Sequence, residues 1–371
     1  IVRTNRTADC GLSATTIRRP VLFSFGHLRR DCGPTCRCLG PTTKIVVTTA
    51  LEPRFRDSER EAAMRRFACP QCGNRVFFND HQCLKCATSL GFDHLADQII
   101  ATDGLSVCAN RSEYKCNWIA AGGTACQACS VEVGPPASDP EVDEFRSAIR
   151  RMLRQLHVLQ VEYVYTTPNL RFALRRSTDD SKVVIGHEDG LITLDVAEAD
   201  PVYREETRAR LGEPYRTSLG HVRHEAGHWH WQACIATNTE TLAKFRATFG
   251  DETADYPDAL ARHYAVGDDG KWQAEHLSFY AGAHPWEDYA ETFAHLLHLT
   301  DTLETARAEG LALPAWGTPA QRYQQWIDVT VSLNELSRSM GMSDLYPFAP
   351  PPTAINKILF LAGIIPAVNL A

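Results

Sequence analysis

Apolar residues recur with the period of an α-helix in four parts of the chain, which predicts that helices form most of the fold. One helix is expected at 140–158, with Asp139 as its cap and a proline at its first position. A strong helical pattern starts near Pro214 and runs to about residue 236. Pro285, followed by acidic residues, marks the start of a third helix, and 355–365 is typical of a packed terminal helix.

Two short runs rich in β-forming residues, 182–185 and 191–196, flank His187-Glu188-Asp189-Gly190. This arrangement predicts a β-hairpin. The chain is therefore expected to have an α+β fold that is mainly helical and contains a small β-sheet.

Composition divides the chain into four parts. Residues 1–63 are rich in Arg, Thr and Pro and show little periodicity, so we expect a poorly ordered extension or a region added by a wrongly chosen start. A cysteine-rich module follows at 64–130, and Gly134-Pro135-Pro136 marks 131–140 as a linker. The remaining part, 141–371, is long enough to bury one substantial core.

The most specific motif is His224-Glu225-Ala226-Gly227-His228, which matches the pattern HExxH within the helix expected at 214–236. Residues four apart share one face of a helix, so both imidazoles can point at a single ion. Such a pair is a zinc clamp, and Glu225 is placed to take a proton from the water that the metal activates. The alternative is an amphipathic helix with solvated histidines, and a third ligand would decide against it.

A third ligand is available on the helix that starts at Pro285. Catalytic zinc sites use three protein ligands and keep the fourth position for water. Glu287, Glu291 and His295 fall at i, i+4 and i+8, on one face of this helix. We expect Glu287 to complete the site, with Glu291 as the alternative.

Other ligand patterns are less favourable. The metzincin pattern HExxHxxGxxH is excluded because Trp231 and Cys234 occupy the positions of its glycine and third histidine. Asp251 and Glu252 are rival ligands, but they lie in a segment typical of a loop. Surface or supporting positions are expected for the remaining histidines near these motifs, which are His187, His221, His230, His284 and His298.

The two motif regions resemble the bacterial zinc-binding metallopeptidases that carry an N-terminal zinc ribbon. The resemblance rests on Arg223–His228 and on Ala283–His295, and it extends from about Met64 to the C-terminus, including 211–217 and 345–348. More distantly, the Glu-x-x-x-Glu arrangement resembles gluzincins of the anthrax lethal factor type. The resemblance implies a zincin-like domain that hydrolyses peptide bonds, and it implies no particular substrate.

The gluzincin resemblance also implies roles for single residues. It implies that Glu287 binds zinc and that Glu291 braces a ligand histidine. It points to Tyr280 as the donor that stabilises the oxyanion, although Tyr280 could instead simply pack beside Phe279. Zincins commonly hold the substrate along an edge strand above the metal helix, and 191–196 is the candidate for that strand.

The spacing of the cysteines indicates metal sites. Cys69-x2-Cys72 and Cys83-x2-Cys86 are two CxxC knuckles and predict a zinc ribbon, with a pair of disulfides as the alternative. A second structural zinc is expected at four further cysteines, which are Cys108, Cys116, Cys126 and Cys129. The sequence thus predicts one catalytic and two structural zinc ions. Thiolate sites need reducing surroundings, which favours the cytoplasm.

Charge and hydropathy restrict the possible partners. The 371 residues carry a formal net charge of −7, which provides no basic field for nucleic acid, and no apolar run reaches the roughly 18 residues of a membrane helix. We therefore expect a zinc peptidase that acts on a peptide or protein, with the ribbon as a possible contact for a protein partner. Two other hypotheses are a non-catalytic zinc-ribbon scaffold protein and a DNA-associated repair protease, which the acidic balance disfavours.

Overall fold

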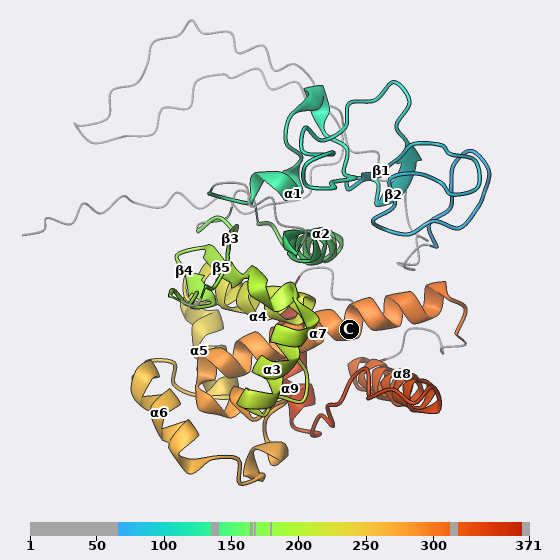
Figure 1. Cartoon of the computed structure of the whole chain (residues 1–371). Helices are drawn as coiled ribbons and strands as arrows, with labels where there is room; N and C mark the ends of the chain where they lie inside the picture. Colours follow the sequence, from blue (N-terminus) through green and yellow to red (C-terminus); the bar gives the residue numbers. More distant parts are fainter. Residues whose placement is uncertain are drawn as a thin grey trace, which may run out of the picture. The chain divides into compact units, whose positions relative to one another are not determined.

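The computed structural model describes residues 66–134, 141–163, 166, 168–178, 180–311 and 318–365. The expected extension at 1–63 and most of the expected linker, 135–140, lie outside these residues. The described part is mainly helical with two small sheets (Figure 1), and its elements are β1 (Leu90–Asp93), β2 (Gln98–Ala101), η1 (Ala121–Gly123), α1 (Gln127–Ser130), α2 (Val142–Val158), β3 (Arg171–Arg175), β4 (Gly186–Glu188), β5 (Leu191–Asp195), η2 (Val196–Ala199), α3 (Pro201–Leu211), α4 (Ser218–His230), η3 (Trp231–Ile235), α5 (Thr239–Phe249), α6 (Tyr256–Val266), η4 (Lys271–Ala274), η5 (Tyr280–Ala283), α7 (Pro285–Ala308), α8 (Pro319–Ser339) and α9 (Ala354–Ile364).

The cysteine-rich module is built around the antiparallel pair β1 and β2. Its small core consists of aromatic residues, among them Phe92 and Trp118, which are fully buried. Asp97 receives two hydrogen bonds from Arg154 of α2, at 2.6 and 2.8 Å. Glu132, in the stretch expected as a linker, forms a β-bridge with Phe172 of β3.

The second sheet has the strand order β3-β5-β4, with β3 parallel and β4 antiparallel to β5. The predicted hairpin is present, but its first strand is β4 and not 182–185. Asp189 and Gly190 both have positive φ and form the two-residue turn. The prediction that 191–196 is the substrate strand is wrong, because β5 is the central strand and is paired on both sides. Within the described sheet, β4 lies at an edge.

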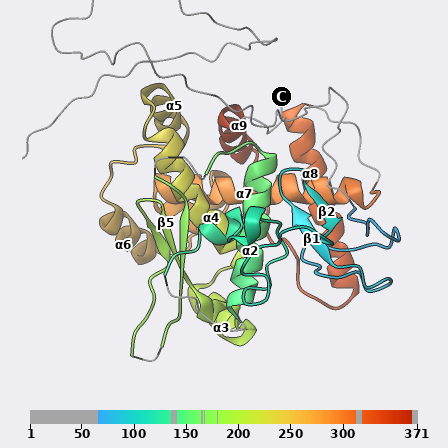
Figure 2. The same cartoon turned by 90° about the horizontal axis from the view of Figure 1, so that it is seen from above.

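The metal-binding motif lies on α4, between α2 and α7 (Figure 1), and Figure 2 shows α2 crossing above them. The helix begins at Ser218 and not near Pro214, because the Thr217 side chain accepts a hydrogen bond from the backbone N–H of Gly220 and caps it. The chain then continues as the π-helix η3 to Ile235, close to the predicted end. A Cβ atom at Gly227 would lie 2.7 Å from the Ala290 Cα, so glycine permits the close approach of α7.

The other predicted helices are present. The helix expected at 140–158 is α2, and it ends at Val158 as expected. Its expected cap, Asp139, lies outside the described residues. Pro285 opens α7, capped by the His284 side chain, and α9 covers the expected terminal helix within one residue at each end.

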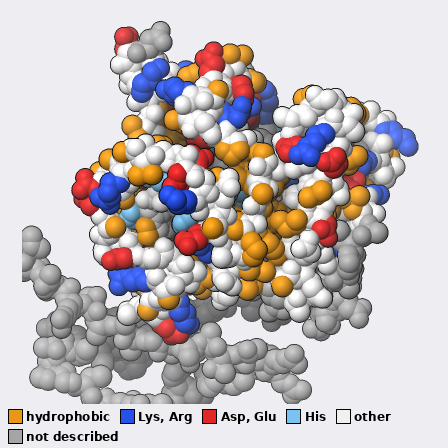
Figure 3. Space-filling view, turned by 90° about the horizontal axis from the view of Figure 1, so that it is seen from below, with side chains coloured by type: hydrophobic (Ala, Val, Ile, Leu, Met, Phe, Trp, Pro, Cys, Tyr) orange, Lys and Arg blue, Asp and Glu red, His pale blue; other side chains and the backbone are white. Residues whose placement is uncertain are grey.

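The helices and the surface bear on the partners that the sequence predicts. None of the helices in the described part of the chain is long and apolar enough to cross a membrane. On the face drawn in Figure 3, acidic and basic side chains are interspersed around an apolar area.

Candidate metal centre

Three of the predicted ligands meet where α4 crosses the first turn of α7. The His224 Nε2 and His228 Nε2 atoms are 3.2 Å apart, and Glu287 Oε2 lies 3.0 Å from the first and 3.4 Å from the second. A tetrahedral zinc ion with bonds of about 2.0–2.2 Å would separate its ligand atoms by about 3.3–3.6 Å. The three side chains therefore fit the donor set and the size of a zinc site.

Glu287 is held so that one oxygen faces the histidines. Its side chain is 1% exposed, and its other oxygen, Oε1, accepts a hydrogen bond of 2.6 Å from the Tyr256 hydroxyl. Burial alone would raise the pKa of this carboxyl, but His228 and His224 hold the pKa well below its usual value. Glu287 is thus an ionised carboxylate with a fixed direction.

Glu291 lies one turn further along α7 and contacts the opposite side of the His224 ring. The His224 Nδ1 is 2.7 Å from Glu291 Oε1, and the Ser278 hydroxyl donates to Glu291 Oε2 at 2.7 Å. Although burial opposes it, His224 lowers the pKa of Glu291 to about 2. A carboxylate in this position fixes the orientation of the ring and leaves His224 Nε2 directed at Glu287.

Glu225 lies on α4, between His224 and His228. Its side chain is buried, and one of its carboxylate oxygens has no hydrogen-bond partner within the described part of the chain. A buried polar atom without a partner is costly unless something else satisfies it, and a water molecule at the metal centre would do so.

Two tyrosines border the centre, and only one of them was predicted. The Tyr280 ring, on η5, lies 5.9 Å from the His224 ring, and its hydroxyl is 3.5 Å from the Tyr256 hydroxyl. Burial and then Glu287 raise the pKa of Tyr280 well above its usual value, so this side chain keeps its proton and can donate it. Tyr256, at the start of α6, has no motif in the sequence, because only the return of α6 onto η5 brings it to Glu287.

The rival ligands lie elsewhere. Asp251 accepts hydrogen bonds from Thr253, and Glu252 pairs with Arg246 at 2.9 Å. His295 contacts the Tyr346 hydroxyl through Nδ1.

Four of the remaining histidines have structural partners. His221 pairs with Glu198, His230 with Tyr289, His298 with Arg223, and His284 caps α7.

His187 differs from these because it stands near the metal centre. It lies on β4 opposite Ile192, which is fully buried, so its side chain points to the same face of the sheet. Burial and the neighbouring His228 lower the pKa of His187 to about 4, and its Nε2 accepts a hydrogen bond of 3.0 Å from the Gly190 N–H. The edge strand β4 therefore passes beside His228.

The cysteines form two clusters, each with four sulfur atoms close together. In the first, Cys69 lies 3.6 Å from Cys86 and Cys72 lies 3.6 Å from Cys83. In the second, the closest pairs are 3.6 and 3.5 Å apart, between Cys108 and Cys129 and between Cys116 and Cys126. Zinc–sulfur bonds of about 2.3 Å give edges of about 3.8 Å, whereas a disulfide needs about 2.05 Å. The separations fit zinc and exclude the disulfide alternative.

Comparison with known proteins gives a consistent result. The sequence matches the family described as "Putative zinc-binding metallo-peptidase" over residues 140–364 and a zinc-ribbon domain over residues 66–139. Uncharacterized proteins of Mycobacterium bovis and Mycobacterium tuberculosis are 39% identical to it over 329 residues, which cover 82% of this chain and 96% of each relative. No solved structure matches the chain.

Proposed function

We propose that this chain, which belongs to the zinc-binding metallo-peptidase family matched above, hydrolyses peptide bonds with a zinc ion held by His224, His228 and Glu287. The observation that carries the proposal is the meeting of three ligand atoms within 3.4 Å of one another. Glu225 supports it, because one of its carboxylate oxygens has no hydrogen-bond partner among the described residues and can accept a proton. A metal site with a purely structural role would not require such a group.

Each polar group of the centre has a part in the proposed reaction. When bound, zinc lowers the pKa of a coordinated water from about 15.7 to about 7 and polarises the carbonyl group. Glu225 takes the proton of the attacking water and passes it to the leaving amine. Tyr280 donates a hydrogen bond to the oxygen that becomes negatively charged. Glu291 keeps His224 in the orientation that the metal requires.

The substrate is proposed to lie along β4. This strand is paired with β5 alone in the described sheet, so its other edge is free for backbone hydrogen bonds with an extended peptide. His187 lies in the middle of β4 and beside His228, so a peptide on this edge would pass the metal centre. The clusters of free thiols support a reducing compartment, the cytoplasm, as the place of action.

The proposal is tested with Glu225→Gln, because the amide keeps the shape of the side chain and cannot accept a proton. We expect the variant to bind zinc as the wild type does and to lose about 10²–10⁴-fold in turnover of a proteome-derived peptide library. Glu240→Gln, on the exposed face of α5, is the matched control and should keep full activity.

The other hypotheses make different predictions in the same assay. Equal turnover in the wild type and Glu225→Gln would exclude Glu225 as the base. No zinc-dependent cleavage by the wild type would favour a non-catalytic scaffold protein. Cleavage that appears only when double-stranded DNA is added would favour a DNA-associated protease.

A further inference from the structure

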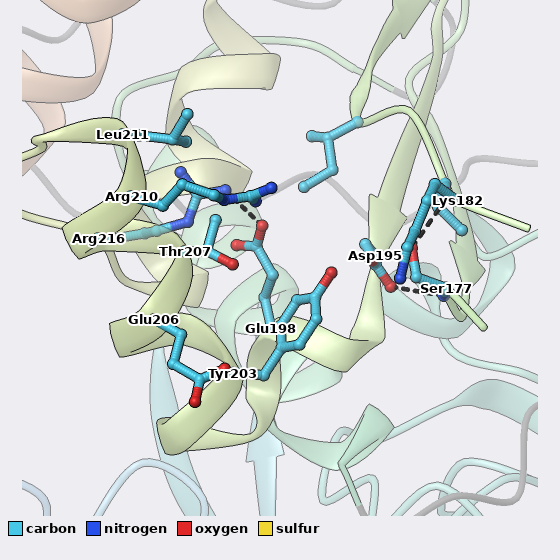
Figure 4. A pocket seen from close by; sticks show the side chains of 12 residues that line it. Ser177, Lys182, Asp195, Glu198, Tyr203, Glu206, Thr207, Arg210, Leu211 and Arg216 are labelled. Carbon is cyan, nitrogen blue, oxygen red and sulfur yellow. Dashed lines mark hydrogen bonds and ion pairs between the residues drawn. The ribbon is translucent and has the colours of Figure 1, made fainter. Parts of the chain in front are cut away.

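A cavity of about 580 Å³ lies beside the metal helix, outside the centre described above. Four segments form its walls: the stretch before β4, the end of β5 with η2, one face of α3, and Arg216 between α3 and α4. Figure 4 shows Glu198 in the middle of the cavity, with Arg210 on one side and Lys182 on the other. Apolar walls are supplied by Val183, Ile185 and Leu211.

Two of the segments that line the cavity also connect it to the metal centre. Glu198 lines it and pairs with His221 at 2.8 Å, and His221 precedes His224 by one turn of α4. Ile185 also lines it and is followed directly by Gly186, the first residue of β4. A peptide paired with β4 and extended beyond Gly186 would therefore pass the cavity.

The distance along the peptide can be approximated from strand geometry. Ile185 and Val183 lie two and four residues from His187, which stands beside His228. At no more than about 3.3 Å per residue, these side chains lie within about 7–13 Å of His187 along the chain, and His187 is on the strand that packs on α4. The cavity is thus within reach of a substrate side chain two to four residues from the bond that is cleaved.

The charged groups deep in the cavity contact other groups of the protein. Glu198 pairs with Arg216 and with His221, and Arg216 donates a second pair of hydrogen bonds to Glu213. Asp195 accepts hydrogen bonds from the backbone N–H groups of Ser177 and Ala197, at 2.9 and 3.1 Å. Glu198 and Asp195 are buried and build the floor of the cavity, and each is held by contacts within the protein.

The charges at the mouth are different. Arg210 and Lys182 have no hydrogen bond or ion pair within the described part of the chain, and Glu206 is the one lining acid in the same situation. Of the charged lining side chains without a partner in this part of the chain, two are therefore cations and one is an acid, and the two cations come from opposite walls. A guanidinium and an ammonium arranged in this way favour a carboxylate, which the guanidinium can bind through two hydrogen bonds.

We propose that this cavity is a specificity subsite that binds a carboxylate of the substrate, two to four residues from the cleaved bond. The inference rests on the proposed peptidase function. The carboxylate belongs to the side chain of Asp or Glu or to the C-terminus of a short peptide, and both present the same chemistry to Arg210 and Lys182.

The first test is the cleavage profile of a proteome-derived peptide library. The wild type is expected to enrich Asp and Glu about tenfold at one position two to four residues from the cleaved bond, because a charge-assisted hydrogen bond contributes about this much. Arg210→Glu should replace that enrichment with Lys and Arg, and Glu206→Gln should strengthen it. Arg262→Glu is the matched control, since Arg262 is also exposed and without a partner in the described part, on α6.

Three outcomes would overturn the subsite. They are a wild-type profile without acidic enrichment at these positions, an enrichment that Arg210→Glu leaves unchanged, and an equal change caused by Arg262→Glu. Enrichment of free C-terminal carboxylates, lost when the library is amidated, would assign the cavity to the peptide terminus, whereas enrichment that persists assigns it to side chains.

A binding experiment separates this inference from the proposed function. If the wild type cleaves nothing, the peptidase proposal fails, and the subsite is then decided by fluorescence anisotropy with labelled, amidated heptapeptides that differ only in one central Asp, Asn or Lys. Tighter binding of the Asp peptide by the wild type, and of the Lys peptide by Arg210→Glu, would support the subsite. Equal affinities for the three peptides in both proteins would refute it.

Discussion

Replacing Glu287 by alanine is expected to abolish stable zinc binding at the catalytic centre, and replacing Glu291 is expected only to weaken it. Glu287 directs Oε2 at both histidines and is almost fully buried, so its loss removes a charged ligand from a desolvated site. Glu291 touches His224 from the other side of the ring, through Nδ1. Its loss frees the orientation of one ligand and leaves the three ligand atoms in place.

The structure gives the expected order of magnitude for each variant. Loss of a carboxylate that orients a ligand imidazole typically costs about 10–100-fold in metal affinity, and this range applies to Glu291→Ala. Tyr256→Phe removes one hydrogen bond to a charged group, which corresponds to a loss of about tenfold or somewhat more. Glu287→Ala should exceed both, because Glu287 is the one carboxylate of the described residues that groups with both imidazoles as a possible metal ligand, whereas Glu291 contacts only the far nitrogen of His224.

The measurement is zinc affinity by competition with a graded series of chelators, repeated with cobalt. Cobalt separates the sites because thiolate ligands give an intense charge-transfer absorption that a His/His/Glu site lacks. Asp251→Ala is the control, since the Asp251 carboxylate accepts hydrogen bonds from Thr253 and does not belong to the His224, His228 and Glu287 group. A larger loss for Glu291→Ala than for Glu287→Ala, or an empty catalytic site in Asp251→Ala, would refute the ligand assignment.

Two further predictions concern metal content and stability. The purified protein should contain three zinc ions per chain, and mild chelation should remove one of them without unfolding, because four-thiolate sites bind with about 10–16 kcal/mol; elemental analysis that gives one ion would contradict this. Asp301→Asn should lower the free energy of unfolding by about 3–5 kcal/mol near neutral pH, because it leaves Arg223 buried without its charged partner. Burial opposes ionisation, but Arg223 and Arg151 hold the pKa of Asp301 below its usual value, so this stabilisation is fully present above about pH 4, the ordinary pKa of Asp, and is lost as the pH falls from there through the lower pKa of the folded state. In denaturant titrations of both proteins from pH 7 to about pH 2, the difference in stability should stay constant down to about pH 4 and shrink below it, and a constant difference over the whole range would refute the pairing.

The zinc-binding motifs could be predicted from the sequence because their geometry is local. In HExxH the helix itself brings His224 and His228 to one face. In each CxxC knuckle only two residues separate the cysteines, and all four sulfurs of the ribbon lie within 4.8 Å of one another. The chain after the first knuckle turns at Gly73 and the chain after the second turns at Ala87, both with positive φ. Spacing alone therefore predicts which pairs lie close, although the pairing of one knuckle with the other depends on the fold.

The order of the strands could not be predicted in this way. The residues 191–196 are β-forming and follow a clear hairpin turn, but no motif in the chain indicates that β3 pairs with them as a parallel neighbour. The parallel partners β3 and β5 start about twenty residues apart, and no single tight turn connects them directly. Whether a strand is central or lies at an edge is therefore decided by the fold. In this sheet the edge strand beside the metal helix is β4 and not the expected strand 191–196.

Tyr256 illustrates the same limit for a single side chain. It follows an Asp cap directly, at the first position of α6, where an aromatic residue has no special meaning in the sequence. Its role follows only from the packing of α6 on η5, which places its hydroxyl 2.6 Å from Glu287.

The register of α7 is the feature that unites the centre. The first turn of this helix carries Glu287, which faces the zinc ligands of α4, and Asp288, which anchors α9 through Lys357 at 2.7 Å. One turn later Glu291 braces His224, and fourteen residues after Glu287, about 21 Å along the helix, Asp301 pairs with Arg223 of α4. A shift of α7 by one residue would rotate these carboxylates by about 100° and break all the contacts together. The buried ion pair at Asp301 therefore opposes the displacement that would most damage the metal site, and it links the stability of the core to the position of a ligand.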